Sequence, residues 1–298
     1  MNILVSGATG LVGQALCKTL KPEGHTVRGM VRHATPFSPD AVYWDPSKGI
    51  LSPADLEGLD AVVHLAGEPI AAGRWTEARK QRILDSRVNG TRLLCERLAG
   101  CKSPPSVLIA ASAMGFYGSR GDEVLTEDSA VGEGFLAEVC QAWEEATKPA
   151  SDAGIRVVNL RIGLVLSREG GALGKMLPAF KLGLGGTLGG GLPWMSWIHL
   201  NDLVSAIVHS LSTESLAGPV NGVSPEPVTN RTFTKTLGRV LGRPTFLPVP
   251  TPVLRMALGE MADELLLSSM RIMPERLQSS GFTFQFDNLE SALRDVLS

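Results

Sequence analysis

The stretch that decides the fold is the N-terminal MNILVSGATGLVG, residues 1–13. A short apolar run at 3–6 ends at Gly7, and Gly10 and Gly13 come after it. A strand that turns at once into a helix needs backbone without a Cβ, for the turn itself and for close packing of helix against strand. The free N–H groups at the start of such a helix bind phosphate. The stretch therefore predicts a strand, a glycine turn and a helix that together bind a dinucleotide.

The spacing GxxGxxG differs from the GxGxxG fingerprint, so the prediction depends on the rest of the chain. Beyond residue 13, short apolar runs alternate with amphipathic stretches. The apolar runs lie at 26–31, 61–66, 106–112 and 156–166, and the amphipathic stretches at 11–20, 76–99, 133–152 and 202–212. Further helical stretches are expected near 229–241, 252–267 and 287–297. Such alternation predicts parallel strands joined by helical crossovers. We expect an α/β fold with a doubly wound parallel sheet.

Composition narrows the possible partners. The 298 residues are 44% hydrophobic, enough for a substantial core, and the net charge is −2. Because no broad basic surface is available, we expect a small-molecule substrate and neither nucleic acid nor a membrane as partner. The four cysteines form no CxxC pair and have no histidine at metal-ligand spacing, so we expect reduced thiols and no metal. With no signal peptide pattern at the N-terminus, the predicted location is cytoplasmic. The oligomeric state is open.

The end of the second apolar run selects the cofactor. Val31 and Arg32 stand where a dinucleotide-binding fold places the group that contacts the adenosine ribose. A carboxylate there accepts from the 2′-hydroxyl, whereas a cation accommodates a 2′-phosphate. Arg32 therefore favours NADP over NAD, unless it is only a solvated surface charge.

Motifs along most of the chain carry a family resemblance. They are GATGLVG (7–13), DAVVHLAGEPI (60–70), RWTEARKQRILDSRVNGTRLL (74–94), SVLIAASAMGFYG (106–118), LRIGLVLS (160–167), WIHLNDL (197–203) and SGFTFQF (280–286). The chain resembles the extended short-chain dehydrogenase/reductase superfamily, and within it the epimerase/dehydratase-like, YfcH-type epimerase family proteins. The resemblance implies a Rossmann NADP-binding domain over 1–170, with a return segment at about 197–223. It also implies a smaller C-terminal substrate lobe, formed by 171–196 and 224–298.

The resemblance assigns cofactor contacts to several backbone segments. They are Gly7, Thr9, Gly10, Leu11, Val12 and Gly13 at the turn, Val31 and Arg32, the strand exit Leu65, Ala66 and Gly67, and Leu164. In an NVxGT motif of the superfamily an asparagine lies on the helix after that strand, and Arg87 occupies its place here. Arg87 can reach a phosphate or a ribose, and Arg82 lies on the same helix; either can instead be a solvated charge.

The catalytic residues depart from the family pattern. Related reductases and epimerases use a serine, a tyrosine and a lysine, and Ser112 occupies the serine position. The tyrosine and lysine positions, four residues apart, hold Phe135 and Val139, which carry no proton. Tyr117 could aim its hydroxyl at the same pocket, as acid/base or as a binding or packing residue.

Three other features complete the expected site. His199 is expected to be a structural histidine rather than a proton carrier, and Asp202 to cap the helix that comes after it. The glycine-rich segment 183–191 predicts a mobile or tightly wound loop beside the substrate, or a linker.

Two hypotheses of function remain. The first is an NADP(H)-dependent oxidoreductase or epimerase acting on a small substrate, with Ser112 assisted by Tyr117. The second is a non-catalytic NADP(H)-binding redox sensor or regulatory module, because the tyrosine and lysine are missing.

Overall fold

The computed structural model describes residues 1–32 and 41–298. Its centre is an eight-stranded sheet in the order β12-β8-β6-β5-β1-β2-β3-β4. These strands are β1 (Asn2–Ser6), β2 (Thr26–Val31), β3 (Val42–Asp45), β4 (Ile50–Leu51), β5 (Ala61–His64), β6 (Val107–Ala113), β8 (Arg156–Ile162) and β12 (Gly218–Gly222). All neighbours pair in parallel except β3 and β4. The strand order reverses between β1 and β5, the point at which open α/β sheets bind ligands.

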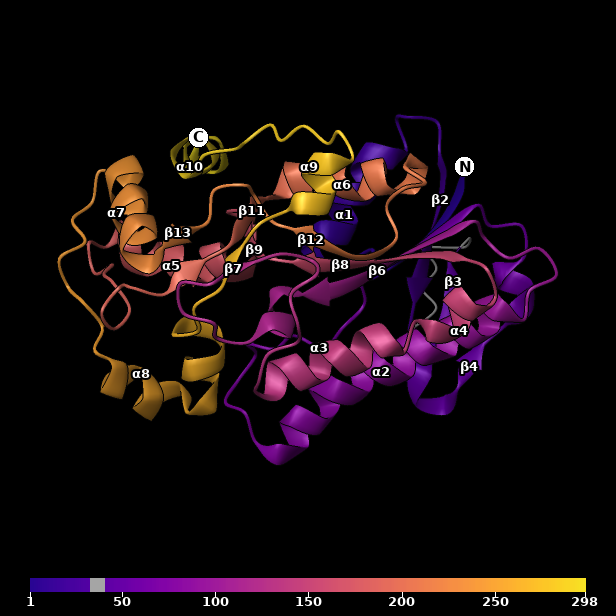
Figure 1. Ribbon diagram of the computed structural model, residues 1–298, viewed down its shortest axis with the longest axis horizontal. Coiled ribbons are helices and arrows are strands. Elements are labelled where there is room, and N and C mark those ends of the chain that lie inside the picture. Colours follow the sequence, from indigo (N-terminus) through magenta and orange to yellow (C-terminus); the bar gives the residue numbers. More distant parts are fainter. Residues whose placement is uncertain (33–40) are drawn as a thin grey trace.

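Helices cover both faces of the sheet (Figure 1). One face carries α1 (Leu11–Leu20) and α6 (Leu200–Ser212), and the other carries α2 (Glu77–Ala99), α3 (Phe135–Glu145) and α4 (Lys148–Asp152). Side chains of β1 alternate between the two layers: Ile3 and Val5 pack in the core on the α1 side, and Leu4 packs in the core on the α2 side. This arrangement is the predicted doubly wound fold.

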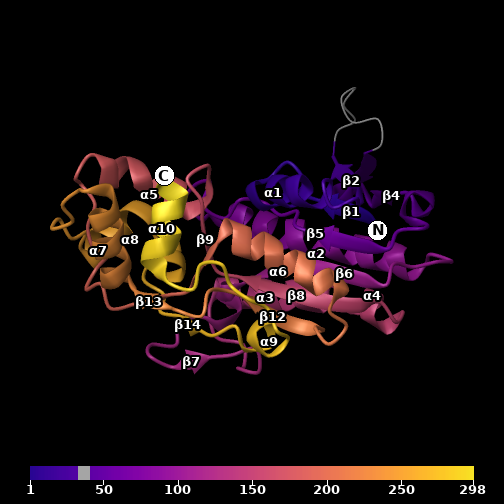
Figure 2. The ribbon, with the colours of Figure 1, turned by 90° about the horizontal axis from the view of Figure 1, so that it is seen from above.

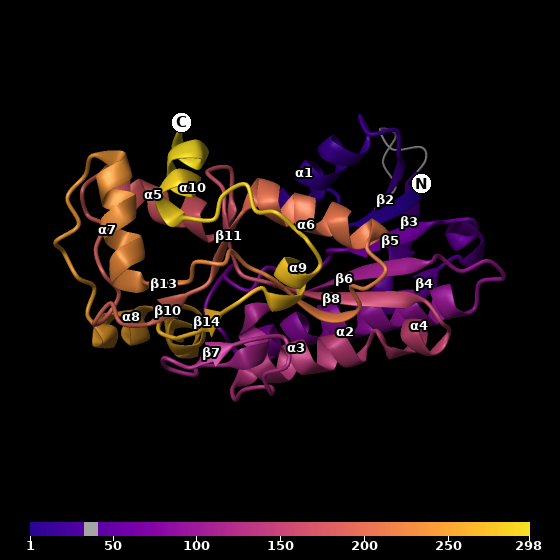
Figure 3. The same ribbon diagram turned by 45° about the horizontal axis from the view of Figure 1, so that its top comes forward.

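A smaller C-terminal region lies beyond the carboxyl edge of the sheet (Figure 2). Its helices are α5 (Gly171–Lys181), α7 (Asn230–Leu241), α8 (Thr251–Leu258) and α10 (Leu289–Leu297), and its short strands are β9 (Leu164–Leu166), β10 (Trp194–Met195), β11 (Trp197–His199), β13 (Val228–Thr229) and β14 (Arg271–Ile272). Helix α9 (Glu275–Ser279) packs instead against β12 of the main sheet. β14 pairs with β7 (Val124–Leu125). Helices α5, α7 and α10 share a core of their own (Figure 3). The predicted domain boundaries stay a prediction.

Three local predictions are corrected. Helix α6 begins at Leu200, and His199 caps it, because its Nδ1 accepts from the backbone N–H of Asn201 at 3.0 Å. The expectation that Asp202 is the cap is wrong: its carboxylate accepts from the backbone N–H groups of Gln285 and Phe286. The stretch 133–152 forms two helices, and 252–267 contains α8 and then a π-helical turn, Ala262–Leu266.

The glycine-rich segment 183–191 is tightly wound. A Cβ on Gly186 would lie 1.6 Å from the carbonyl oxygen of Leu247. Val249 exchanges backbone hydrogen bonds with this segment, donating to Thr187 and accepting from Gly189. Close approach of two backbones therefore explains the glycine at 186.

Within the described residues, no helix is both long and apolar enough to cross a membrane. All four cysteines are free, as expected.

Candidate functional site

The turn after β1 packs directly against the exit of β5. Gly7 has a φ of +67°, and a Cβ there would lie 2.9 Å from the carbonyl carbon and oxygen of Leu65. A Cβ on Gly13 would lie 2.2 Å from the carbonyl oxygen of Gly7. Both positions therefore exclude a side chain, for reasons of space that the sequence pattern predicts.

The N-terminus of α1 is open. Gly10 is its N-cap residue, no side chain caps it, and its first turn contains no acidic residue. Four other helices are capped by side chains, those of Thr76 in α2, His199 in α6, Thr229 in α7 and Asn288 in α10, whereas α3, α4, α5, α8 and α9 lack such a cap, as α1 does. The uncapped N–H groups and the positive end of the helix dipole favour an anion at Gly10. Thr9 and Gly10 are exposed there, while Leu11 and Val12 are half-buried.

Buried hydrogen bonds run from Ser6 through His64 to Thr91, and this polar chain holds the backbone at the exit of β5 in place. Ser6 Oγ accepts from the backbone N–H groups of Leu65 and Ala66 at 3.0 and 3.2 Å and donates to His64 Nδ1 at 2.7 Å. His64 Nε2 therefore carries the ring hydrogen and donates to Thr91 Oγ1, 3.1 Å away. Burial lowers the pKa of His64 to about 4, so the ring is neutral. The sequence alone did not predict these hydrogen bonds. Their only signal in the sequence is the presence of polar residues inside apolar strands.

Arg87 lies beside the same strand exit. A Cβ on Gly67 would lie 3.5 Å from Arg87 Cζ and Nη2, so the guanidinium faces Gly67 directly. Arg87 Nη1 donates to the carbonyl of Ile83 at 3.2 Å, and Cζ lies 4.9 Å from the centroid of the Trp143 ring. The Arg87 guanidinium therefore lies at the exit of β5, and its contact with a cofactor stays a prediction.

The other predicted cofactor residues lie along the carboxyl edge of the sheet. Val31 ends β2, and Arg32 comes next with an exposed side chain. Leu164, half-buried, begins β9 two residues after β8 ends. The side chain of Arg82 is exposed on α2, in contrast to that of Arg87.

Ser112 and Tyr117 belong to one buried network around Arg161. Ser112 Oγ donates to Glu144 Oε1 at 2.7 Å, and Arg161 binds both oxygens of that carboxylate at 2.8 and 2.9 Å. Arg161 Nη1 also donates to the Tyr117 hydroxyl, which in turn donates to Asn221 Oδ1 at 2.7 Å. Each hydroxyl therefore gives its single hydrogen to an acceptor inside the network.

This network is buried. Tyr117 is fully buried and Ser112 is 3% exposed. Burial raises the pKa of Tyr117, against the opposing effect of Arg161. No sequence pattern signals the partners Glu144, Arg161 and Asn221, since each comes from a different part of the chain.

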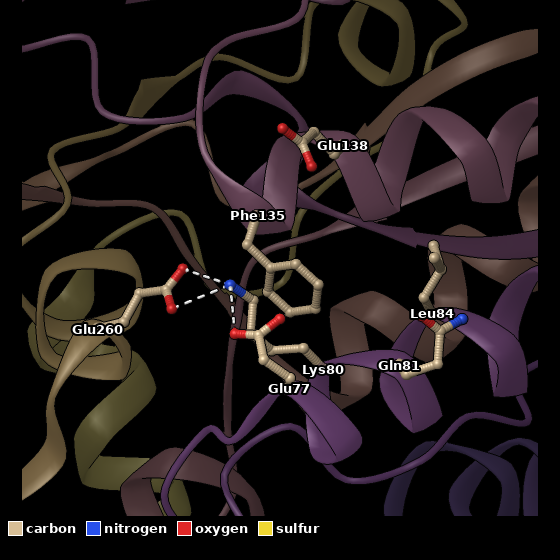
Figure 4. A pocket seen from close by; sticks show the side chains of 7 residues that line it. All are labelled: Glu77, Lys80, Gln81, Leu84, Phe135, Glu138 and Glu260. Atoms are coloured by element: carbon tan, nitrogen blue, oxygen red, sulfur yellow. Dashed lines mark hydrogen bonds and ion pairs between the residues drawn. The ribbon is translucent and has the colours of Figure 1, made fainter.

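Phe135 and Val139, in the tyrosine and lysine positions, lie in an apolar cluster. Its other members include Trp75, Ile83, Leu136, Met261 and Leu258. Phe135 also lines a cavity of about 340 Å³ between the N-terminal ends of α2 and α3 (Figure 4). There Lys80 Nζ lies 4.8 Å from the Phe135 ring centroid and is held at 3.0 Å by both oxygens of Glu260. These hydrogen bonds raise the pKa of Lys80, which stays a bound cation and not a proton donor.

The glycine turn at the strand reversal and the open helix beside it define a doubly wound nucleotide-binding protein. The chain belongs to the NAD dependent epimerase/dehydratase family, whose pattern matches residues 3–221. Residues 249–296 match a second family, the Domain of unknown function (DUF1731). The family predicted from the sequence is confirmed.

Similar proteins cover nearly the whole chain. The Epimerase family protein MT2273 of Mycobacterium tuberculosis is 43% identical over 98% of this chain and 96% of its own. The crystal structure of human epimerase family protein SDR39U1 (isoform 2) with NADPH matches at a TM-score of 0.90 and 34% identity, over 99% of both chains. A chloroplastic SDR39U1 homolog of Arabidopsis thaliana is 37% identical over 100% of this chain and 87% of its own. The cytoplasmic location therefore stays a prediction.

Proposed function

We propose that this protein binds NADP(H) across the carboxyl edge of its sheet. The observation that carries the proposal is the uncapped N-terminus of α1, against which Gly7 and Gly13 leave no room for a side chain. Backbone N–H groups from Leu11 to Gly13 hold the pyrophosphate, since that of Gly10 already donates to the carbonyl of Gly7, and Arg32 binds the 2′-phosphate. The human relative, crystallised with NADPH, supports the same cofactor.

The nicotinamide half extends toward β5 and β6. Backbone at Leu65, Ala66 and Gly67, together with Leu164, lines its path, and the Ser6–His64 chain keeps that strand exit in place. When bound, the cofactor supplies hydride exchange, and the protein supplies orientation and control of protons. The first candidate activity is that of an oxidoreductase or epimerase acting on a small substrate, with Ser112 and Tyr117 handling the proton.

A specific observation favours a second candidate, NADP(H) binding without turnover. Ser112 and Tyr117 each donate their only hydrogen to Glu144 or Asn221 and would have to exchange that partner before serving a substrate. Phe135 and Val139 offer no replacement. A sensor or regulatory module needs only the cofactor site, which this network leaves intact.

Calorimetry of the full chain with NADPH and NADH tests the binding, and Gly13→Val is the variant expected to abolish it. The absence of binding by the unaltered protein would overturn both candidates.

The two candidates are separated by absorbance at 340 nm with panels of alcohols, carbonyl compounds and nucleotide-diphosphate sugars. Turnover that Ser112→Ala and Tyr117→Phe each abolish supports the enzyme. Tight NADPH binding with turnover absent supports the binding module, and turnover unchanged in both variants would remove Ser112 and Tyr117 from the proton-handling role.

A further inference from the structure

Within the described residues, Arg87 lacks the ion pair that Arg161 and Arg79 make, as do the half-buried Arg156 and Arg271. Arg161 binds both oxygens of Glu144, and Arg79 lies 3.7 Å from Glu68. Within residues 1–32 and 41–298, no carboxylate oxygen lies within the 4.0 Å of an ion pair from the Arg87 guanidinium. Its one hydrogen bond to a carbonyl uses one of five N–H donors. A half-buried cation left in this state is costly unless an acceptor arrives from outside the chain.

The position of the guanidinium indicates which acceptor. Arg87 stands on α2, but its charged end lies between Gly67 at the exit of β5 and Trp143 on α3. Trp143 is one turn beyond Val139, at which the family pattern has a lysine. The charge of Arg87 also acts on Cys140, the next residue after Val139. A cation from α2 therefore reaches the neighbourhood that a lysine on α3 would occupy.

The indole of Trp143 holds the guanidinium in this orientation. Its Nε1 donates to Thr91 Oγ1 at 2.9 Å, the same oxygen that accepts from His64. The ring is thus fixed to the polar chain that also holds Leu65 and Ala66. A planar guanidinium stacked on a fixed ring keeps its remaining donors pointing in a defined direction.

We infer that Arg87 takes the place of the absent lysine and binds the hydroxyls of the nicotinamide-side ribose. The inference rests on the proposed NADP(H) site and adds to it the part of the cofactor that this residue recognises. In the proposed binding mode the pyrophosphate lies at the N-terminus of α1, on the opposite face of the sheet from α2, whereas Gly67 lies past the end of β5, on the proposed path of the nicotinamide half. The ribose between them is the acceptor that a guanidinium on the α2 side meets first. An arginine stays charged at neutral pH, so this contact binds and orients and transfers no proton.

Three ligands of increasing length test this assignment by calorimetry on the full chain. 2′-Phospho-ADP contains both phosphates of the pyrophosphate but lacks the nicotinamide-side ribose, 2′-phospho-ADP-ribose contains that ribose, and NADPH adds the nicotinamide. Arg87→Gln is expected to weaken NADPH and 2′-phospho-ADP-ribose about 10- to 100-fold, the loss of hydrogen bonds from a charged group. Binding of 2′-phospho-ADP is expected to change less than about 2-fold, because Arg87 makes no contact with it. Arg97→Gln, exposed near the end of the same helix, is the matched control and should change none of the three.

The outcomes are distinct. Equal weakening of all three ligands would assign Arg87 a structural role and overturn the inference, as would no weakening of any. Failure of the unaltered protein to bind any of them would overturn the proposed function instead. If Arg87→Gln does not fold, the unaltered protein labelled with ¹⁵N-arginine serves, with the Arg87 resonance assigned by Arg87→Lys. NADPH should then shift its Nε–H signal and 2′-phospho-ADP should not; equal shifts, or none, would contradict the inference.

Discussion

Two regions along the carboxyl edge of the sheet differ in whether their hydrogen-bond donors already have partners within the protein. At β1 and β5, the N-terminus of α1 is uncapped and Arg87 has donors to spare. At β6, β8 and β12, Arg161 binds Glu144 and Tyr117, and the hydroxyls of Ser112 and Tyr117 are already committed. We call the region at β1 and β5 the open part and the region at β6, β8 and β12 the closed part. Since a ligand is bound by donors that the protein has not already used, the difference favours the open part as the proposed binding site.

The closed part also links distant segments. Asn221 accepts from Tyr117 and donates through Nδ2 to the carbonyl of Met273, in the C-terminal region. Glu127, buried beside it, accepts from the backbone N–H groups of Asn221 and Arg276. Burial raises the pKa of Glu127, so this carboxylate too depends on its partners. The network therefore fastens the C-terminal region to the sheet.

The largest expected effect comes from removing the cation of the closed part. Arg161→Met leaves the Glu144 carboxylate enclosed without its partner, and we expect about 3–5 kcal/mol off the free energy of unfolding. Urea unfolding monitored by circular dichroism measures it. The double variant Arg161→Met/Glu144→Leu should recover much of the loss, because no uncompensated charge remains. A loss below about 1 kcal/mol, the range of exposed pairs, would show that the network is not structural.

The next effect concerns the polar chain that supports the open part. The pKa of His64 is about 4 in the folded protein, below its ordinary 6.5, because burial disfavours the charged ring. Its contribution is therefore fully present above pH 6.5 and is lost as the pH falls toward 4. The slope is about 1.4 kcal/mol per pH unit, or about 3 kcal/mol over the window. Unfolding curves at pH 7, 6 and 5 measure it against His64→Gln, which should have a flatter profile; parallel profiles would contradict this role.

How much of the fold and of the candidate site the sequence predicts depends on how far apart the interacting residues are along the sequence. The glycine turn and α1 from residue 11 depend on neighbouring residues, and the structure has them where expected. The pairing of Ser6 with His64 joins residues 58 positions apart, and Ser112 meets Glu144 across 32. No local pattern encodes such pairs. Asp202 shows the same limit, because a carboxylate near a helix start looks like a cap until residues 285 and 286 are in place.

A variant of Arg32 tests the part of the proposed cofactor site that binds the adenosine 2′-phosphate. Arg32→Asp replaces the cation for the 2′-phosphate with a charge that repels it, and we expect about 2 kcal/mol weaker NADPH binding, roughly 30-fold. NADH, which has a 2′-hydroxyl, should lose little or gain, since a carboxylate accepts from it. Calorimetry with both coenzymes measures the ratio. Equal losses for the two would remove Arg32 from the site.

Ser112 gives the smallest expected effect and bears most directly on function. Ser112→Ala removes one hydrogen bond to a carboxylate that Arg161 still holds by both oxygens, so the loss of unfolding free energy should be about 1 kcal/mol. NADPH affinity should be unchanged, because the serine hydroxyl is turned toward Glu144 and not toward the open donors. A large loss of NADPH affinity would mean that the hydroxyl leaves Glu144 when the cofactor binds. The two parts of the edge would then be coupled, and Ser112 would be free to act on a substrate.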